Sequence, residues 1–346
     1  MATGTPGHTG RRVTAEAHRR GLDVVVSGRD ASRLREVAEG AEVRVADVND
    51  TPALARAFDG CDVVIGCAGP FSRVGDPVVR AAITTGVHNV DTYAEQPFLR
   101  RVFDTYTEQA EQAGVRVVPA VGFDILLGDM IAHLAGARVE PLEELTIAYQ
   151  TNDFDMTQGT IRSSLQVLLD GDLAYEDDQW RPAEGLAVRR TSFTLPGHST
   201  ERMTARWPGA EIVTVLRHVR ARRVEIITDA AVFTPELISL MRLPADQWDA
   251  VIGQLPEGPS EERRAVADFT IVAEAVGVDG RRATGMAHAT DIYGSAAVFT
   301  VEAARRLAAG EAKAGVLSPA QAFDPAAFLE GLAWHGIEWN VVAGEK

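Results

Sequence analysis

The sequence predicts an α/β fold: a doubly wound parallel sheet with a truncated first strand, followed by a second, α+β domain with a mostly antiparallel sheet. Two observations predict it. Apolar strand-like runs alternate with helix-like runs over roughly the first 120 residues, and after residue 142 strand-like runs follow one another with few helices between them. We expect domains at residues 1–137 and 138–292, with residues 293–346 forming helices that return to the first domain.

A glycine-rich stretch lies almost at the first residue. Residues 2–10 read A-T-G-T-P-G-H-T-G. In a strand-turn-helix unit the first glycine allows a tight turn, the second lets the backbone approach a pyrophosphate, and the third lets the helix pack closely on the sheet. The residues expected to contact a dinucleotide here are Gly4, Thr5, Pro6, Gly7, His8, Thr9 and Gly10.

The strand before this stretch is shorter than the motif requires. A buried strand of about five or six residues normally precedes the glycines, and it is central in the sheet. Only three residues precede Gly4. We therefore expect either a first strand reduced to a stub or a true start codon upstream of Met1.

Each later strand of the first domain is short and apolar, and a helix follows it. The expected strands are residues 22–27, 41–45, 62–67, 88–91 and 116–119. The expected helices are residues 11–20, 32–39, 51–58, 78–85 and 96–112. This alternation is more specific than the glycines alone and indicates a dinucleotide-binding Rossmann sheet.

The end of the second strand favours NADP as the cofactor. An acidic residue at this point favours NAD, whereas arginine accommodates a 2′-phosphate. The chain reads Ser27-Gly28-Arg29 here, and Arg33 follows one helical turn later. The alternative is that Arg29 only ends the sheet in solvent. Asp47 follows the third strand, where an adenine contact is common.

The ends of the fourth and fifth strands are expected to face the nicotinamide. Small residues at the end of a parallel strand let the ring and its ribose come close. The cofactor-binding residues expected here are Cys67, Ala68, Gly69, Pro70, Phe71 and Asp91. Asp91 could hold the ribose or the side chain of Tyr93.

Two side chains are expected to be catalytic. Tyr93 follows the fifth strand and could protonate a developing enolate or alkoxide. Asp124, in G-F-D after the sixth strand, could orient the substrate or the cofactor amide. The alternatives are that Tyr93 packs its ring on the core and that Asp124 caps a helix beginning near Ile125.

Composition excludes several classes of protein. The 46% hydrophobic and 24% charged content is typical of a globular chain, and the net charge of −15 disfavours nucleic acid and anionic membranes as partners. We expect no membrane span and a cytoplasmic location. The only lysines, Lys313 and Lys346, lie near the C-terminus, so neither a P-loop lysine nor a Tyr-Lys proton-transfer pair exists. The two cysteines and the scattered histidines predict no metal site.

The second domain is expected to hold consecutive strands and a hairpin. The strands are residues 144–150, 190–195, 211–216 and 223–228, and the hairpin spans residues 269–289 with its turn at Asp279-Gly280. Helices are expected over residues 160–169 and 295–309.

Several segments together carry a resemblance to a known family. They are T-G-T-P-G-H-T-G, S-G-R-D, C-A-G-P-F-S-R-V-G-D-P-V-V-R-A, H-N-V-D-T-Y and P-A-V-G-F-D-I-L-L-G-D, with G-T-I-R-S-S-L and G-V-L-S-P-A-Q-A-F further on. The chain resembles the saccharopine dehydrogenase-like reductases, most closely their trans-acting enoyl reductase branch, which works beside polyketide and lipid synthases. The resemblance implies an NADP-dependent reductase, a carrier-bound or small acyl substrate, and a homodimer formed through the second sheet.

Three functions stay open. The first is hydride transfer to a polarised C=C bond, with Tyr93 or water as the proton donor. The second is reduction of a C=N bond, as in saccharopine or opine formation, and the third is a non-catalytic NADP-binding scaffold. The basic run at residues 217–223 could dock an acyl-carrier protein or synthase, or it could only protect a strand edge with charge.

Overall fold

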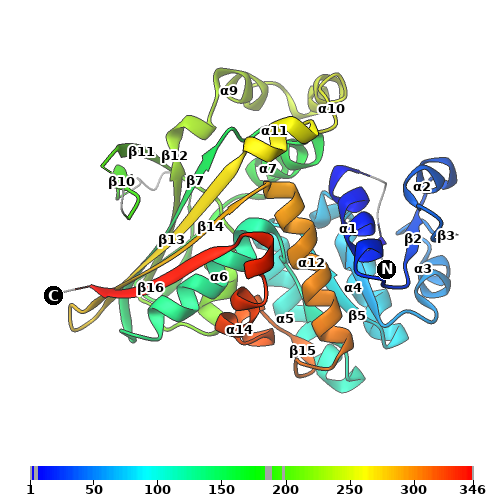
Figure 1. Cartoon of the computed structure of the whole chain (residues 1–346), viewed down its shortest axis with the longest axis horizontal. Coiled ribbons are helices and arrows are strands. Elements are labelled where there is room, and N and C mark those ends of the chain that lie inside the picture. The colour runs from blue at the N-terminus through cyan, green and yellow to red at the C-terminus, as the bar shows by residue number, and fades with distance from the viewer. Residues whose placement is uncertain (1, 4–6, 184–188, 197–198, 345–346) are drawn as a thin grey trace. The chain divides into compact units, whose positions relative to one another are not determined.

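The computed structural model describes residues 2–3, 7–183, 189–196 and 199–344 and divides the chain into two compact units (Figure 1). The first unit comprises Met1–Phe123 and Tyr293–Phe323. The second comprises Asp124–Ile292 and Asp324–Lys346. The expected α/β class, with one parallel and one mostly antiparallel sheet, is confirmed.

The first unit is built on a seven-stranded parallel sheet in the order β15-β6-β5-β4-β1-β2-β3. The strands are β1 (Ala2–Thr3), β2 (Val25–Gly28), β3 (Glu42–Val45), β4 (Val63–Gly66), β5 (His88–Asp91), β6 (Arg116–Val118) and β15 (Gly315–Val316). β1 has two residues among those described, and it pairs with β2 on one side and β4 on the other. β1 therefore lies inside the sheet, as the first strand of a dinucleotide-binding sheet does.

The helices of the first unit begin and end where the sequence supplies caps. They are α1 (His8–Arg19), α2 (Ala31–Val37), α3 (Thr51–Phe58), α4 (Phe71–Thr85), α5 (Gln96–Ala113), α12 (Ile292–Ala308) and α13 (Pro319–Ala322). Asp30 and Asp50 accept backbone N–H bonds at the starts of α2 and α3, and left-handed glycines at Gly86 and Gly114 end α4 and α5. α4 begins seven residues before the expected helix, passing through Pro77.

The second unit is built on a long sheet in the order β10-β11-β12-β7-β13-β14-β16, with β8 and β9 attached to β12. The strands are β7 (Leu142–Asn152), β8 (Leu173–Glu176), β9 (Gln179–Pro182), β10 (Ser192–Thr194), β11 (Glu201–Arg206), β12 (Arg223–Asp229), β13 (Asp268–Gly277), β14 (Arg282–Thr290) and β16 (Glu338–Gly344). All neighbours are antiparallel except β12 and β7.

One face of this sheet packs on α6 (Phe123–Gly136), which runs along it (Figure 1). A Cβ at Gly285 of β14 would come within 2.5 Å of Ile131, so only glycine allows the strand and helix to approach this closely. The other helices of the unit are α7 (Gln158–Asp170), α8 (Glu211–Thr214), α9 (Pro235–Met241), α10 (Trp248–Ile252), α11 (Glu261–Val266) and α14 (Pro325–Glu330).

The structure differs from the predicted organisation in three places. Residues 211–216 form α8 and a 3-10 turn, η1 (Val215–Arg217), in place of a strand. A short apolar run buried on all sides carries no periodicity that separates strand from helix. α6 belongs to the second unit, which therefore begins before residue 138. Residues 338–344 do not return to the first unit, because β16 pairs with β14 over seven residues.

Candidate functional site

The described part of the glycine stretch opens α1. Gly4, Thr5 and Pro6 lie outside the described residues, and Gly7 is the N-cap of α1. The helix therefore begins at His8, three residues earlier than expected, and places Thr9 and Gly10 in its first turn. This turn contains no acidic residue. The backbone N–H groups of a first helical turn, and the positive dipole end that they form, are suited to a pyrophosphate.

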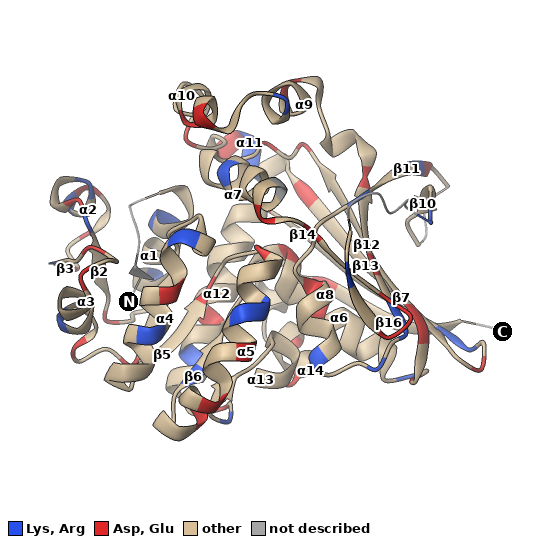
Figure 2. Cartoon of the chain, turned by 180° about the vertical axis from the view of Figure 1, so that it is seen from behind, with Lys and Arg blue, Asp and Glu red and all other residues tan. Residues whose placement is uncertain are grey.

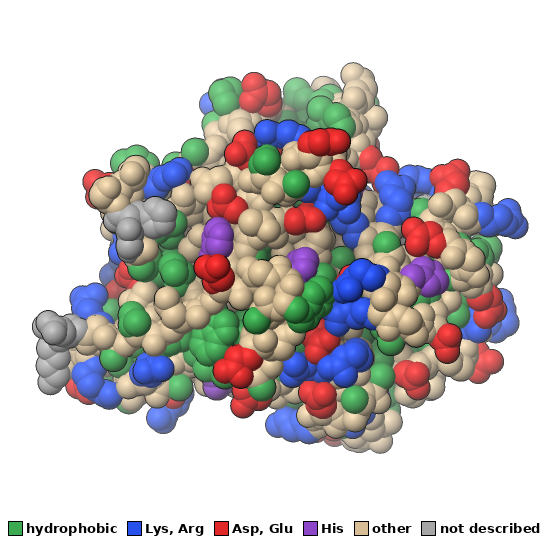
Figure 3. Space-filling model, viewed as in Figure 1, with side chains coloured by type: hydrophobic (Ala, Val, Ile, Leu, Met, Phe, Trp, Pro, Cys, Tyr) green, Lys and Arg blue, Asp and Glu red, His purple; other side chains and the backbone are tan. Residues whose placement is uncertain are grey.

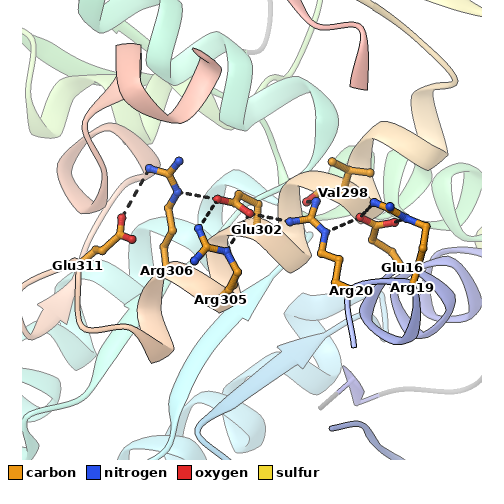
Figure 4. Close-up of polar contacts among 8 residues, drawn as sticks. All are labelled: Glu16, Arg19, Arg20, Val298, Glu302, Arg305, Arg306 and Glu311. Atoms are coloured by element: carbon orange, nitrogen blue, oxygen red, sulfur yellow. Dashed lines mark hydrogen bonds and ion pairs between the residues drawn. The ribbon is translucent and has the colours of Figure 1, made fainter. Parts of the chain in front are cut away.

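Both ends of α1 are held by the C-terminal segment of the same unit. At the start, the His8 ring lies edge-on to Tyr293 at 5.0 Å, and Arg12 donates to His8 Nε2 at 2.9 Å. At the end, Arg20 donates to Glu16 and to Glu302 of α12, both at 2.6 Å (Figure 4). The proposed phosphate helix is thus fixed to α12 by packing and by an ion-pair network.

The network on α12 is centred on one buried carboxylate. Glu302 accepts hydrogen bonds from Arg20, Arg305 and Arg306, although its side chain is only 8% exposed. Burial raises the pKa of Glu302, but the hydrogen bonds and charges of Arg305 and Arg306 outweigh burial and lower this pKa to about 2. Glu302 is therefore ionised at neutral pH. No local pattern in the sequence points to this pairing, since Arg20 is 282 residues away.

The expected adenosine end carries two arginines that have no carboxylate partner among the described residues. Arg29 and Arg33 are exposed, and neither guanidinium forms a hydrogen bond or ion pair within that part of the chain. The Asp30 carboxylate accepts hydrogen bonds from the backbone N–H groups of Ser32 and Arg33, at 3.0 and 3.2 Å. The Asp47 carboxylate accepts a hydrogen bond from the Asn49 backbone N–H at 2.9 Å, so it stabilises the turn in which it lies. Ser27 is buried near the end of β2.

The loop after β4 is fixed by a buried glutamate that sequence reasoning missed. The Gly69-Pro70 peptide is cis, and α4 starts directly after it at Phe71. Glu95, which is 0% exposed, accepts from Phe71 N at 2.9 Å and from Ala94 N at 3.2 Å. The hydrogen bond from Phe71 to Glu95 therefore holds the end of the loop that includes Cys67, Ala68 and Gly69. Burial raises the pKa of the Cys67 thiol to about 12, so this cysteine stays protonated.

Asp91 links β5 to the loop after β6. Its Oδ1 accepts from Ala120 N at 2.8 Å, and its carbonyl accepts from Val121 N at 2.7 Å. Ala120 has a positive φ of 62°, a conformation that this pair of bonds helps to hold. Burial raises the pKa of Asp91 well above its ordinary value. The structure shows a backbone-fixing role for Asp91, and a ribose contact stays a prediction.

Tyr93 lies in the core of the first unit. Its ring is 2% exposed and packs between Phe71 and Phe98, at 5.0 and 4.9 Å. Burial raises its pKa well above the ordinary value, and the charges of Asp91 and Glu95 raise it further. A phenol in this state is a poor acid, so the structure favours the packing alternative for Tyr93.

Beside Tyr93 is a small cavity with unpaired polar groups. Its lining includes Gly66, Asn89, Asp91 and Tyr93, and its volume is about 10 Å³. The Tyr93 hydroxyl and both amide atoms of Asn89 are buried without a hydrogen-bond partner among the described residues. This space is at the lower limit for one water molecule.

We expect Tyr93→Phe to leave the protein as stable as the wild type or slightly more stable. An unpaired buried hydroxyl costs about 1–3 kcal/mol, and phenylalanine keeps the ring packing. Thermal unfolding measures this. A decrease in stability of more than about 1 kcal/mol would show that the hydroxyl is hydrogen-bonded to an internal water.

The other predicted catalytic residue, Asp124, lies in the first turn of α6 in the second unit. It is partly exposed, follows the end of β6 by six residues in the chain, and has a pKa raised by burial. Glu211 of α8, which is 0% exposed, has a pKa raised well above its ordinary value by burial and by the charge of Asp124. Sequence reasoning placed Glu211 in a strand and missed this acid.

Part of the basic run at residues 217–223 is paired with carboxylates. Arg222 pairs with Glu143 and Asp178, and Arg223 pairs with Glu144 and Glu176. Figure 2 shows acidic and basic segments together around the start of β7. This arrangement supports the alternative of a charge-protected edge over a basic docking site.

Two further kinds of site are absent from the described part of the chain. None of the described helices has the length and apolar content needed to span a bilayer. Among the same residues, no three His, Cys, Asp or Glu side chains are grouped to hold a metal ion.

The chain is similar to known oxidoreductases. Residues 4–130 match the model of the NAD(P)H-binding family. A mouse saccharopine dehydrogenase-like oxidoreductase is 26% identical over 202 residues, which are 52% of this chain and 44% of that protein. A candidate trans-acting enoyl reductase of Mycobacterium tuberculosis is 30% identical over 179 residues, 48% of this chain and 43% of that protein. A lipid droplet localized protein of Caenorhabditis elegans is 34% identical over 121 residues, which are 32% of this chain and 28% of that protein.

The fold extends this similarity over the whole chain. Apo saccharopine dehydrogenase (L-Glu forming) from Saccharomyces cerevisiae matches with a TM-score of 0.67 over 99% of both chains, at 17% identity. At this identity the likeness shows the fold alone. The chain covers less than half the length of each of the three relatives in sequence.

Proposed function

We propose that this chain, which carries an NAD(P)H-binding domain and has saccharopine dehydrogenase-like homologues, is an NADPH-dependent reductase of a polarised C=C bond. Its substrate would be an enoyl thioester or a related polyketide or lipid intermediate, because one relative is named as an enoyl reductase. The observation that carries the proposal is the α1 N-terminus, whose first turn has no acidic side chain and which the chain enters from the central strand.

The residues present fit the dinucleotide. The start of α1 would hold the pyrophosphate, and Arg29 and Arg33 would hold a 2′-phosphate. Gly66 lets β4 and β5 lie close together beside the loop expected to face the nicotinamide. A Cβ added at Gly66 would come within 3.1 Å of the Asp91 Cβ. When bound, NADPH supplies the hydride.

Asp124 is the proton donor that the structure supports better than Tyr93. Asp124 is a partly exposed residue, and burial of its carboxyl raises its pKa, so it stays protonated to a higher pH than an ordinary aspartate. In the proposed reaction Asp124 protonates the α carbon of the substrate. Turnover should then fall as pH rises through the pKa of Asp124, because only its protonated form donates.

Reduction of a C=N bond in an amino-acid adduct is less well supported. Such a substrate carries carboxylates that two or more arginines must bind. The partly buried arginines of the second unit already pair with protein carboxylates, for example Arg190 with Glu274, Arg206 with Asp172 and Arg264 with Asp291.

A cytoplasmic location, a homodimer through the second sheet, and an acyl-carrier protein or synthase as partner are also proposals. The face drawn in Figure 3 mixes acidic, basic and apolar side chains. The mixed charges of this face, and the ion pairs of Arg222 and Arg223 with carboxylates, are as compatible with a free small-molecule thioester as substrate as with a substrate on a docked carrier protein. Light scattering of the purified chain would test for the dimer.

The test is NADPH binding followed by a substrate panel. Fluorescence titration should show NADPH binding tighter than NADH binding. Trans-2-enoyl thioesters should then oxidise NADPH, while mixtures of a 2-oxo acid and an amino acid should not. Oxidation with the imine-forming mixture alone would replace the C=C proposal by the C=N one. Binding without any oxidation would favour the scaffold, and no binding would reject both reductase functions.

A further inference from the structure

Two helices of the first unit follow neighbouring strands of its sheet. β1 and β4 pair in parallel, and α1 and α4 are the next helices after them in the chain. α1 has 12 residues and α4 has 15, and neither has an acidic residue in its first turn. Neither N-cap residue, Gly7 or Pro70, makes a side-chain capping bond. Because helix N-termini favour anions, the starts of both helices are suited to a phosphate group on these local features alone.

A carboxylate from a distant part of the chain occupies the start of α4. Glu95 Oε1 accepts from the backbone N–H of Phe71, the first residue of α4, at 2.9 Å. Glu95 Oε2 accepts from the Ala94 backbone N–H at 3.2 Å. Glu95 is the N-cap residue of α5, yet its side chain makes no capping bond to that helix. One N–H donor on each oxygen suits an ionised carboxylate, which only accepts hydrogen bonds.

The Glu95 carboxylate disfavours a phosphate group at the start of α4. Like charges repel, and this repulsion is screened little because Glu95 is 0% exposed. The pyrophosphate of a dinucleotide would therefore lie at α1, in agreement with the glycine stretch before that helix. The nicotinamide end, which carries no phosphate beyond the pyrophosphate, would lie at residues 67–70.

The same carboxylate fixes the loop between β4 and α4. Gly66, the last residue of β4, pairs with Asp91 of β5, and Phe71 is held by Glu95. The Phe71 ring is 7% exposed and packs on Tyr93 at 5.0 Å. Residues 67–70 are thus anchored at both ends. Because Glu95 has no exposed surface, it would act on a bound nicotinamide only through this loop.

We propose that Glu95 is a positioning residue for the nicotinamide half of the cofactor. Its carboxylate keeps phosphate groups away from the start of α4 and holds residues 67–70 in the shape that receives the ring. The inference rests on the proposed function, because it requires a dinucleotide to bind to the first unit. Loss of this carboxylate should weaken the binding of ligands that contain a nicotinamide and spare ligands that lack it.

Glu95→Gln tests the two halves of the ligand separately. Glutamine keeps the length of the side chain but has one acceptor oxygen, so it cannot accept from both Phe71 and Ala94. Isothermal titration calorimetry should show a Kd for NADPH raised about tenfold, because one buried N–H donor loses its partner. The Kd for 2′-phospho-ADP-ribose, which has the same phosphates but no nicotinamide, should change less than about twofold.

Asp50→Asn is the matched control. Asp50 also accepts a backbone N–H bond at a helix start of the first unit, from Ala53 at 2.9 Å. This substitution should leave both Kd values unchanged. An equal rise of both Kd values in Glu95→Gln would show that the substitution disturbs the whole binding site, and two unchanged values would show that nicotinamide binding does not depend on Glu95. Either result would overturn the proposal.

The hold of Glu95 on the loop can be tested without a cofactor. Amide hydrogen exchange over residues 67–75 should be faster in Glu95→Gln than in the wild type, while residues 51–58 of α3 keep the wild-type rate. Equal exchange over residues 67–75 in the two proteins would also overturn the proposal. If the wild type binds neither NADPH nor 2′-phospho-ADP-ribose, the proposed function fails and the role of Glu95 toward the cofactor fails with it. The exchange rates would then still show whether Glu95 holds this loop.

Discussion

Glu302→Gln should lower the free energy of unfolding at pH 7 by about 3 kcal/mol. Glutamine keeps the shape but removes the charge that Arg20, Arg305 and Arg306 share. Arg20 and Arg306 are only 13% and 11% exposed, so water cannot fully replace the carboxylate. Thermal and denaturant unfolding would measure the change. Figure 4 shows that the ion pair of Arg20 with Glu302 joins α1 to α12, so the substitution should weaken the attachment of the two helices.

The effect should depend on pH in a defined direction. The pKa of Glu302 is about 2 in the folded chain, against an ordinary value of 4.5. A lowered pKa gives stability that is fully present above pH 4.5 and is lost as pH falls toward 2. The difference between the wild type and Glu302→Gln should therefore be constant above about pH 5 and shrink below it.

Glu311→Gln is the control at the edge of the same network. Glu311 is 43% exposed and lies 3.6 Å from Arg306, so its removal should cost less than about 0.5 kcal/mol. Equal stability of Glu302→Gln and the wild type at pH 7 would show that the network does not hold α1 to α12.

The parallel sheet of the first unit could be predicted because its signals are local. The predicted strand at 88–91 and helix at 51–58 have the same bounds as β5 and α3, since capping residues and short apolar runs mark them. The start of α4 was missed because Gly75 and Pro77, which disfavour a helix in sequence, lie within its first turns. A Cβ on Gly75 would come within 2.6 Å of the Phe98 ring, so the glycine reflects packing.

The interactions that sequence reasoning missed join distant segments. Glu95 holds Phe71, Glu302 holds Arg20, and Glu211 packs against Gly128. None of these carboxylates has a spacing motif, because its partner is set by the tertiary fold. The predicted cofactor residues, by contrast, follow from the rule that strand ends face the ligand, and they stay predictions that binding experiments must test.

Selectivity for NADPH over NADH should depend on Arg29 and Arg33. The double variant Arg29→Ala/Arg33→Ala should raise the Kd for NADPH about 10- to 100-fold, because a charged hydrogen bond to a phosphate contributes about 1.5–3 kcal/mol. The Kd for NADH should change less than about twofold, because NADH has no 2′-phosphate for these residues to bind. Fluorescence titration with both dinucleotides measures the two values.

Arg35→Ala separates this specific effect from a general reduction of positive charge. Arg35 is also exposed and also lies on α2, but in its last turn. It should therefore change both Kd values little. An unchanged ratio of NADPH to NADH affinity in the double variant would show that Arg29 and Arg33 are solvent-exposed surface residues. An equal decrease for both dinucleotides would instead place them against the shared adenosine. Only a selective decrease for NADPH supports the assignment, because the 2′-phosphate is the single group in which the two cofactors differ.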